Sequence, residues 1–289
     1  MSKPVRNLIL GGTGLLGQQV VQKSISLGHE TVATYFREKS KNYLGDFGIK
    51  GYQISDDRAH ELESLVNVLE PSNIINCISL SSINCRSENE LKSVYVNIPK
   101  ILGGISEKFG INVINISTDA VFSGSTAINS EDSITLPQTR YGIYKLQGEV
   151  ESRYVKNIRC SMFGIDEFEE RGLFNWFLST ISPKIFFGYR FSGVSTQTLA
   201  NSIFIVLEKP EDYPNVINVA GESIDKGDLL LKLNRISKIN KPVKIEQQNE
   251  KNFSLDGSLF AKISGVRIPS VDQQIDELIK KSSKVTKYL

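Results

Sequence analysis

The segment "RYGIYKLQGEVE", residues 140–151, contains two tyrosines and one lysine that could do acid–base chemistry. Residues four apart share one face of a helix, whereas adjacent residues point about 100° apart. In a helix, Lys145 therefore faces Tyr141 rather than Tyr144. A tyrosine hydroxyl has a pKa of about 10 in water, and a nearby ammonium lowers this pKa by stabilising the phenolate. The pair Tyr141–Lys145 could thus give and take back a proton near neutral pH.

A glycine-rich segment near the N-terminus could bind a pyrophosphate. "LILGGTGLLGQQVV" spaces Gly11, Gly14 and Gly17 three residues apart, between a strand-like run and an amphipathic run. Gly11 permits a tight turn, Gly14 lets the backbone approach the ligand, and Gly17 lets a helix pack on the strand. The helix N-terminus favours negative charge. We therefore predict a dinucleotide site, with a tight turn that binds nothing as the alternative. Its residues would be Gly11, Thr13, Gly14, Leu15, Leu16 and Gly17.

The residues about 20 positions after these glycines bear on the choice of dinucleotide. A carboxylate there would hold the ribose 2′-hydroxyl of NAD. The chain reads Thr34, Tyr35, Phe36 and Arg37 instead. Because a carboxylate is missing and a cation is available, a 2′-phosphate is better tolerated, and NADP(H) is favoured over the alternative NAD(H). Arg37 would bind that phosphate, or else be a surface charge at the start of a loop.

Strands and helices must position these residues. Over the first half of the chain, short apolar runs typical of strands alternate with segments of helical periodicity. We expect strands at residues 5–10, 30–36, 51–54, 73–80, 111–117 and 157–163. Helices are expected at residues 58–69 and 88–109 and from residue 138 to 155. Alternating strands and helices predict an α/β fold, a doubly wound parallel sheet of the Rossmann type. Ser117 and Thr118 would end the fifth strand, where ligands are expected and a hydroxyl could polarise a substrate oxygen.

After about Gly164 the rhythm changes to shorter elements, with helices expected at 196–208, 225–236 and 270–281 and strands at 215–221 and 242–248. We predict a dinucleotide-binding domain of residues 1–164 and a smaller substrate-binding region of residues 165–289, with some segments returning to the main sheet. Arg171 or Arg190 could hold a diphosphate. An aromatic cluster is expected to be core rather than a stacking platform for a nucleotide. Its members are Phe174, Trp176, Phe177, Phe186 and Phe187.

Composition excludes several classes of protein. The chain has 289 residues, 40% hydrophobic and 23% charged, with a formal net charge of +2. That balance gives no electrostatic case for nucleic acid or for an anionic membrane surface, and no apolar run approaches the ~20 residues of a membrane helix. We expect a cytoplasmic protein, because no signal-peptide pattern begins the sequence. Three cysteines without metal-ligand spacing and only two histidines predict free thiols and no metal site.

Together these motifs resemble the extended short-chain dehydrogenase/reductase family, and within it the dTDP-4-dehydrorhamnose reductase group. The similar segments are "GGTGLLG", "STDAVFSG", "YGIYKLQGE", "GVSTQTLA" and "NVINVAG", which cover nearly the whole chain. The resemblance implies that Thr118, Tyr141 and Lys145 are catalytic, with Tyr141 as proton donor to a sugar C4 carbonyl. It also implies that Ser117, Tyr141 and Lys145 contact the cofactor, that Asn97 is structural, and that the substrate is a nucleotide-linked keto-sugar.

The chain departs from the family at two places. Ala120 stands where the family usually has tyrosine, and "NCISLSS" stands where it usually has alanines. Both lie near the expected pocket, so they bear on the identity of the substrate. Two other functions remain open: a regulatory subunit similar to the beta subunit of methionine adenosyltransferase, and an epimerase that retains its cofactor. A homodimer is also open. Asp119 would lie near the substrate or cap a turn.

Overall fold

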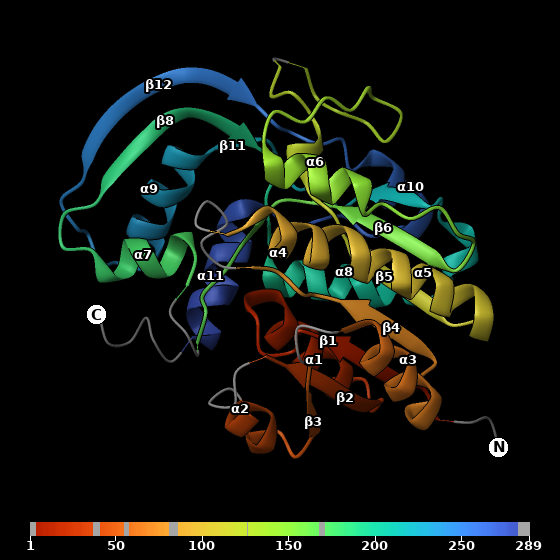
Figure 1. Ribbon diagram of the computed structural model, residues 1–289. Coiled ribbons are helices and arrows are strands. Elements are labelled where there is room, and N and C mark those ends of the chain that lie inside the picture. Colours follow the sequence, from red (N-terminus) through yellow and green to blue (C-terminus); the bar gives the residue numbers. More distant parts are fainter. Residues whose placement is uncertain are drawn as a thin grey trace. The chain divides into compact units, whose positions relative to one another are not determined.

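The computed structural model describes residues 4–36, 41–54, 58–80, 86–125, 127–167 and 171–282 (Figure 1). The chain forms two compact units, each built from three segments. The first comprises Met1–Ser117, Thr139–Ile158 and Ala200–Ile217, and the second comprises Thr118–Gln138, Arg159–Leu199 and Asn218–Leu289. The division at residue 164 into a cofactor domain and a substrate region stays a prediction.

A seven-stranded sheet forms the centre of the first unit, in the order β10-β6-β5-β4-β1-β2-β3. The pairs from β3 across to β6 are parallel. The strand order reverses between β1 and β4, which is where ligands bind beyond the carboxyl ends of doubly wound sheets. The predicted Rossmann fold is confirmed. The strands are β1 (Arg6–Leu10), β2 (Glu30–Tyr35), β3 (Lys50–Gln53), β4 (Asn73–Asn76), β5 (Asn112–Ile116), β6 (Val155–Arg159) and β10 (Val216–Asn218).

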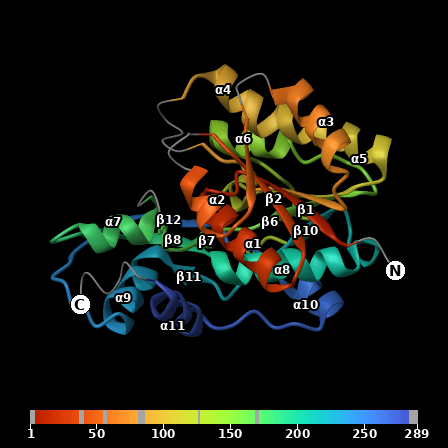
Figure 2. The ribbon, with the colours of Figure 1, turned by 90° about the horizontal axis from the view of Figure 1, so that it is seen from below.

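Helices cover both faces of this sheet. Figure 2 shows α3, α5 and α6 on one face and α1 and α8 on the other. The helix expected at 88–109 is continuous, but its middle turn is a π-helix, η3 (Ser93–Asn97). The bounds are α1 (Leu15–Ser26), α2 (Lys41–Asp46), α3 (Arg58–Leu69), α4 (Glu88–Lys92), α5 (Ile98–Phe109), α6 (Arg140–Gln147) and α8 (Thr196–Glu208).

Several elements are shorter than predicted, and hydrogen bonds explain two of these differences. The helix expected from residue 138 to 155 ends at Gln147 as α6. Side chains bind the carbonyls beyond it: Asn115 Nδ2 donates to Gly148 O over 3.0 Å, and Asn215 Nδ2 donates to Val150 O over 2.9 Å. Strand β4 ends at Asn76, not at residue 80, because its side chain accepts a hydrogen bond from the Ile78 N–H and turns the chain.

Asparagines form a buried ladder across the centre of the sheet. Asn76 Nδ2 donates to Asn115 Oδ1 over 3.1 Å, and Asn115 Nδ2 donates to Asn157 Oδ1 over 2.9 Å. These three residues are register partners on β4, β5 and β6. A buried amide costs free energy unless it is paired, so the ladder penalises any slip of the register.

The second unit contains a three-stranded sheet in the order β11-β8-β12, with β12 parallel and β11 antiparallel to β8. A separate pair, β7–β9, takes residues 162–163, so the strand expected at 157–163 is divided between two sheets. The predicted helices 225–236 and 270–281 form as α9 and α11. The elements are β7 (Met162–Phe163), α7 (Leu173–Ser179), β8 (Lys184–Phe191), β9 (Val194–Ser195), β11 (Ile224–Asp225), α9 (Lys226–Ile236), β12 (Lys244–Asn252), α10 (Ser258–Ser264) and α11 (Val271–Lys281).

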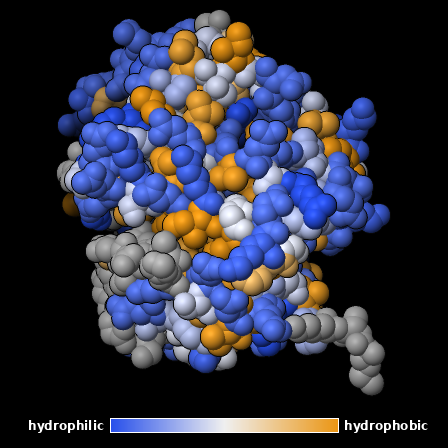
Figure 3. All heavy atoms as spheres, turned by 45° about the vertical axis from the view of Figure 1, so that its right-hand side comes forward, coloured by the Kyte–Doolittle hydropathy of each residue, from blue (hydrophilic) through white to orange (hydrophobic). Residues whose placement is uncertain are grey.

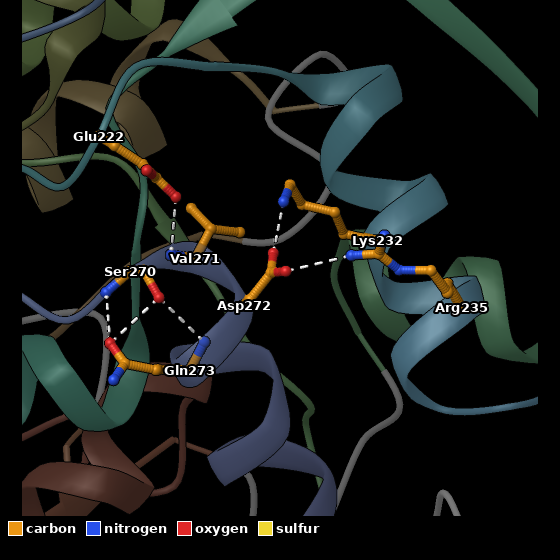
Figure 4. Close-up of polar contacts among 7 residues, drawn as sticks. All are labelled: Glu222, Lys232, Arg235, Ser270, Val271, Asp272 and Gln273. Carbon is orange, nitrogen blue, oxygen red and sulfur yellow. Dashed lines mark hydrogen bonds and ion pairs between the residues drawn. The ribbon is translucent and has the colours of Figure 1, made fainter.

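Polar contacts fix the start of α11, as Figure 4 shows. Ser270 and Gln273 form a capping box, in which each side chain accepts a hydrogen bond from the other's backbone N–H. Asp272 pairs with Lys232 over 2.5 Å and with Arg235 over 3.1 Å, and both cations lie on α9. The apolar sides of the two helices meet in one core cluster that includes Leu233 and Ile275.

The predicted aromatic cluster divides between core and surface. Phe174 and Phe177 are fully buried in the core of the second unit, while Trp176 and Phe186 remain 40% and 38% exposed. One face of the molecule, drawn in Figure 3, is largely hydrophilic, with apolar side chains scattered among the polar ones. Within the described ranges, no helix combines the length and the apolar character that crossing a bilayer requires.

Candidate active site

The glycine turn between β1 and α1 has the close contacts that its sequence predicts. Gly11 adopts a φ of +73°, and its N–H donates to Thr34 Oγ1 over 3.0 Å. A Cβ at Gly17 would lie 2.1 Å from Gly11 O, so no side chain fits there. A Cβ at Gly11 would lie 3.1 Å from the Ile78 backbone. The turn is therefore packed between the start of α1 and the segment that follows β4.

The N-terminus of α1 is suited to an anion. Its N-cap residue, Gly14, makes no side-chain capping bond, and the first turn carries no acidic residue. Gln18 Nε2 donates to Thr13 O over 3.1 Å and holds the turn, and Leu16 is buried. The first N–H groups of a helix have no partner within the helix and point along its positive end. The bare backbone and the glycines fit a dinucleotide pyrophosphate.

Lys145 lies on the sheet-facing side of α6 and is only 8% exposed. Its Nζ donates a hydrogen bond to Ile116 O, the last residue of β5, over 2.8 Å. The same ammonium lies 4.8 Å from the centre of the Tyr95 ring. A carbonyl oxygen and the face of an aromatic ring both stabilise a cation. The lysine is thus fixed at the carboxyl end of β5, where the doubly wound fold places ligands.

Tyr141 contacts the same aromatic ring as Lys145. The Tyr141 ring meets the Tyr95 ring edge to face, with centres 5.3 Å apart and planes at 82°. Thr139 caps α6 by accepting a hydrogen bond from the Gly142 N–H over 3.1 Å, so the helix begins just before Tyr141. The two residues that the helical spacing paired therefore lie on one side of α6, against Tyr95.

Tyr144 is engaged elsewhere. Its hydroxyl donates to Glu88 Oε1 over 2.8 Å, and the residue is 6% exposed. Burial and, after it, the neighbouring carboxylate raise the pKa of Tyr144. Glu88 in turn pairs with Lys92, four residues further along α4. Tyr144 therefore lacks both the position and the environment of a proton donor that Lys145 assists.

The hydroxyls after β5 belong to different units. Ser117, in the first unit, is buried and donates to Glu149 Oε1 over 2.6 Å. Thr118, in the second unit, caps a short 3₁₀-helix: its Oγ1 accepts from the Ala120 N–H over 3.2 Å and donates to Asp119 Oδ1 over 3.1 Å. The hydrogen bonds of Thr118 thus fix the position of its hydroxyl.

Asp119 belongs to a polar cluster in the second unit that the sequence does not reveal. Burial raises the pKa of the Asp119 carboxyl to about 6, although hydrogen bonds from Ser161 and Thr118 and the charge of Lys226 oppose the shift. Burial likewise lowers the pKa of Lys226, whose Nζ lies 3.5 Å from the centre of the Tyr189 ring. Residues 189 and 226 are distant in sequence from residue 119, so only the fold brings them together.

The predicted phosphate-binding arginines lie in different surroundings. Arg37 lies outside the described residues. Arg171 forms an ion pair with the buried Asp166 over 3.0 Å, and its diphosphate role stays a prediction. Arg190 is exposed and donates to Ser223 O over 3.3 Å.

The chain is similar to known proteins in both sequence and structure. A sequence profile described as RmlD substrate binding domain matches residues 5–160, more than half of the chain. A hypothetical dTDP-4-dehydrorhamnose reductase from Sulfolobus tokodaii has a similar structure, with a TM-score of 0.75 and 25% identity over 90% of this chain and 94% of that one. The dTDP-4-dehydrorhamnose reductase from Bacillus anthracis in complex with NADP gives a TM-score of 0.78 at 15% identity, covering 98% of this chain and all of that one.

A curated relative is named as a subunit of another enzyme. Methionine adenosyltransferase 2 subunit beta from Xenopus laevis is 31% identical over 158 residues, which are 50% of this chain and 41% of that protein. The match therefore spans less than half the length of the relative.

The fold and the glycine turn define an extended short-chain dehydrogenase/reductase. Within that class, the chain belongs to the RmlD substrate binding domain family.

Proposed function

We propose that this protein is an NADP(H)-dependent reductase of the 4-keto group of a nucleotide-linked deoxysugar. The observation that carries the proposal is the shared contact of Tyr141 and Lys145 with Tyr95, while Glu88 engages the competing Tyr144. The family match and the reductase from Sulfolobus tokodaii support the same class of reaction.

Each residue has a distinct role in the proposed reaction. The turn of Gly11, Gly14 and Gly17 seats the pyrophosphate at the N-terminus of α1. The bound cofactor supplies a hydride to the carbonyl carbon. Tyr141 gives its proton to the oxygen of that carbonyl, and Thr118 orients the oxygen through its hydroxyl. Lys145 binds the ribose of the cofactor and stabilises the tyrosine after its proton has left.

The residues at the end of β2 support the proposal of NADP(H) rather than NAD(H) as the cofactor. Residues 34–36 include no carboxylate that would hold a ribose 2′-hydroxyl, and Arg37 supplies a cation next to them in the sequence. Comparing the affinities for NADPH and NADH in the wild-type protein and in Arg37→Ala tests this choice. We expect the substitution to weaken NADPH binding and to leave NADH binding nearly unchanged.

The reaction is tested by measuring NADPH oxidation against a panel of nucleotide-linked 4-keto sugars. We expect turnover with at least one of them, and a loss of roughly 10²- to 10⁴-fold in kcat for Tyr141→Phe, the contribution typical of a general acid. NADPH affinity of this variant should stay within about twofold of wild type. A Tyr141→Phe protein that binds NADPH and reduces the sugar at the wild-type rate would overturn the proposal.

A second candidate follows from the curated relative. The match to methionine adenosyltransferase 2 subunit beta raises a non-catalytic role as the NADP-binding subunit of a larger enzyme. Mixing the purified chain with a methionine adenosyltransferase catalytic subunit and analysing the mixture by size-exclusion chromatography separates the two functions. Co-elution, together with the absence of NADPH oxidation by every keto-sugar of the panel, would favour this candidate.

A further inference from the structure

Tyr95 lies in the π-helical turn η3 and is 1% exposed, yet its ring contacts both residues of the proposed proton-transfer pair. The Lys145 ammonium lies 4.8 Å from the ring centre, and the Tyr141 ring meets the Tyr95 ring edge to face. The face of an aromatic ring is negative and its edge is positive, so both contacts have favourable electrostatics. The Tyr95 ring therefore restrains the positions of both partners.

The hydroxyl of Tyr95 contacts a different part of the first unit. It accepts a hydrogen bond from the Leu80 N–H over 2.9 Å and shares another with Ser79 Oγ over 3.2 Å. Burial raises the pKa of Tyr95, so the hydroxyl stays protonated and can itself donate a hydrogen bond. The segment that it holds follows β4.

That segment also contacts the glycine turn. The backbone of Ile78 approaches Gly11 so closely that a Cβ there would lie 3.1 Å from the Ile78 N and Cα atoms. The Cys77 N–H donates to Leu10 O, the residue before Gly11, over 2.9 Å. Residues 77–80 thus connect the Tyr95 hydroxyl with the turn that would seat the pyrophosphate.

The backbone at Tyr95 adds a further constraint on α6. A Cβ at Gly148, the residue that ends α6, would lie 1.9 Å from Tyr95 O. The helix that carries Tyr141 and Lys145 therefore packs directly against the turn that carries Tyr95. A movement of this turn would therefore shift both the Tyr141–Lys145 pair and residues 77–80.

We propose that Tyr95 is a positioning residue that fixes the Tyr141–Lys145 pair through its ring and the cofactor-side segment 77–80 through its hydroxyl. This inference rests on the proposed reductase function and adds to it a residue that contacts neither substrate nor cofactor. The two roles are separable, because Tyr95→Phe removes only the hydroxyl, whereas Tyr95→Met removes the aromatic face as well and fills much of its volume.

The experiment compares these two variants with wild type and with Tyr144→Phe and Tyr144→Met, which change a buried tyrosine of the same apolar cluster. NADPH affinity is measured by fluorescence titration, kcat and KM by NADPH oxidation, and the pH dependence of kcat over the stable range. Thermal unfolding of all four variants measures the structural cost of each change.

We expect Tyr95→Phe to bind NADPH roughly two- to tenfold more weakly, because the hydroxyl's hydrogen bonds to Leu80 and Ser79 are lost, with an unchanged pH dependence of kcat. Tyr95→Met should lower kcat by about tenfold or more and shift the pH dependence, because the lysine ammonium loses its aromatic face. Tyr144→Phe and Tyr144→Met should alter unfolding alone.

Two results would overturn the inference: wild-type NADPH affinity in Tyr95→Phe, or a wild-type kcat and pH profile in Tyr95→Met. If wild type reduces no keto-sugar, the proposed function fails on that result. NADPH affinity alone then decides the inference about the segment 77–80. Equal affinities in wild type and Tyr95→Phe would contradict it.

Discussion

The hydroxyl of Tyr144 donates a hydrogen bond to the carboxylate of Glu88 over 2.8 Å, which draws this tyrosine away from Lys145, its neighbour in sequence. We therefore expect Tyr144→Phe to keep kcat within about twofold of wild type. The variant should lose about 1 kcal/mol of unfolding free energy, the net value of one hydrogen bond. Kinetic assays and urea unfolding check both effects. A loss of turnover comparable with that of Tyr141→Phe would reverse the assignment of the two tyrosines.

A substitution at Gly17 tests directly whether the glycine turn binds the cofactor. A Cβ there would lie 2.1 Å from Gly11 O, so the backbone of Gly17→Ala must shift at the site of the pyrophosphate. We expect NADPH affinity to fall by at least about tenfold. Gly104→Ala on α5 is the matched control, since no atom beyond the local helix backbone lies within 4 Å of its added methyl, and alanine in a helix should raise stability by up to about 1 kcal/mol. Equal NADPH binding by both variants would argue against the site.

The asparagine ladder should contribute to stability. Asn115 is 3% exposed and makes side-chain hydrogen bonds to Asn76, Asn157 and Gly148 O. Asn115→Ala leaves these groups buried without a partner, and we expect a loss of about 2–4 kcal/mol in chemical unfolding. Asn112→Ala, which loses one longer bond of 3.3 Å to Asn73, is the control, with about 1 kcal/mol expected. Similar losses in both would show that the ladder adds little.

Asp119 makes stability depend on pH. Burial raises its pKa from 3.8 to about 6, so the folded state binds this proton more tightly than the unfolded state does. Its ionisation therefore costs stability as the pH rises from about 4 to about 6, and the cost persists above that range. Asp119→Asn carries no such charge. We expect the stability of this variant relative to wild type to increase, on the order of 1–3 kcal/mol, from pH 3 to pH 7. A difference independent of pH would contradict this environment of the carboxyl.

Two substitutions at the start of α11 compare the stability contributed by a helix cap with that contributed by surface ion pairs (Figure 4). Ser270→Ala removes the capping box, and we expect a loss of about 1 kcal/mol in unfolding free energy. Asp272→Asn removes the ion pairs to Lys232 and Arg235, whose side chains are 32% and 69% exposed. Its cost should stay below about 1 kcal/mol and shrink in high salt. A larger effect at Asp272 than at Ser270 would contradict this ranking.

Much of the fold could be predicted from local pattern. The alternation of apolar runs and helical periods indicated the strand and helix sequence of the Rossmann sheet, and the helix expected to end at residue 109 does end there as α5. Element ends were less predictable: Gly148 ends α6 because distant side chains bind the carbonyls that follow, which no local window contains. The division of residues 157–163 between β6 and β7 likewise depends on which strands pair with them.

The sequence by itself determined which residues could do chemistry, because the spacing alone sets their local arrangement. Glycines three residues apart need only a tight βα turn, and a tyrosine and a lysine four residues apart need only a helix to share one face. Only the tertiary structure decided what surrounds them. The ring of Tyr95 against Tyr141 and Lys145, the carboxylate of Glu88 on Tyr144, and the burial of Asp119 near Lys226 join residues that are remote along the chain. Such contacts follow from how strands and helices pack, and packing is a property of the whole chain rather than of any one segment.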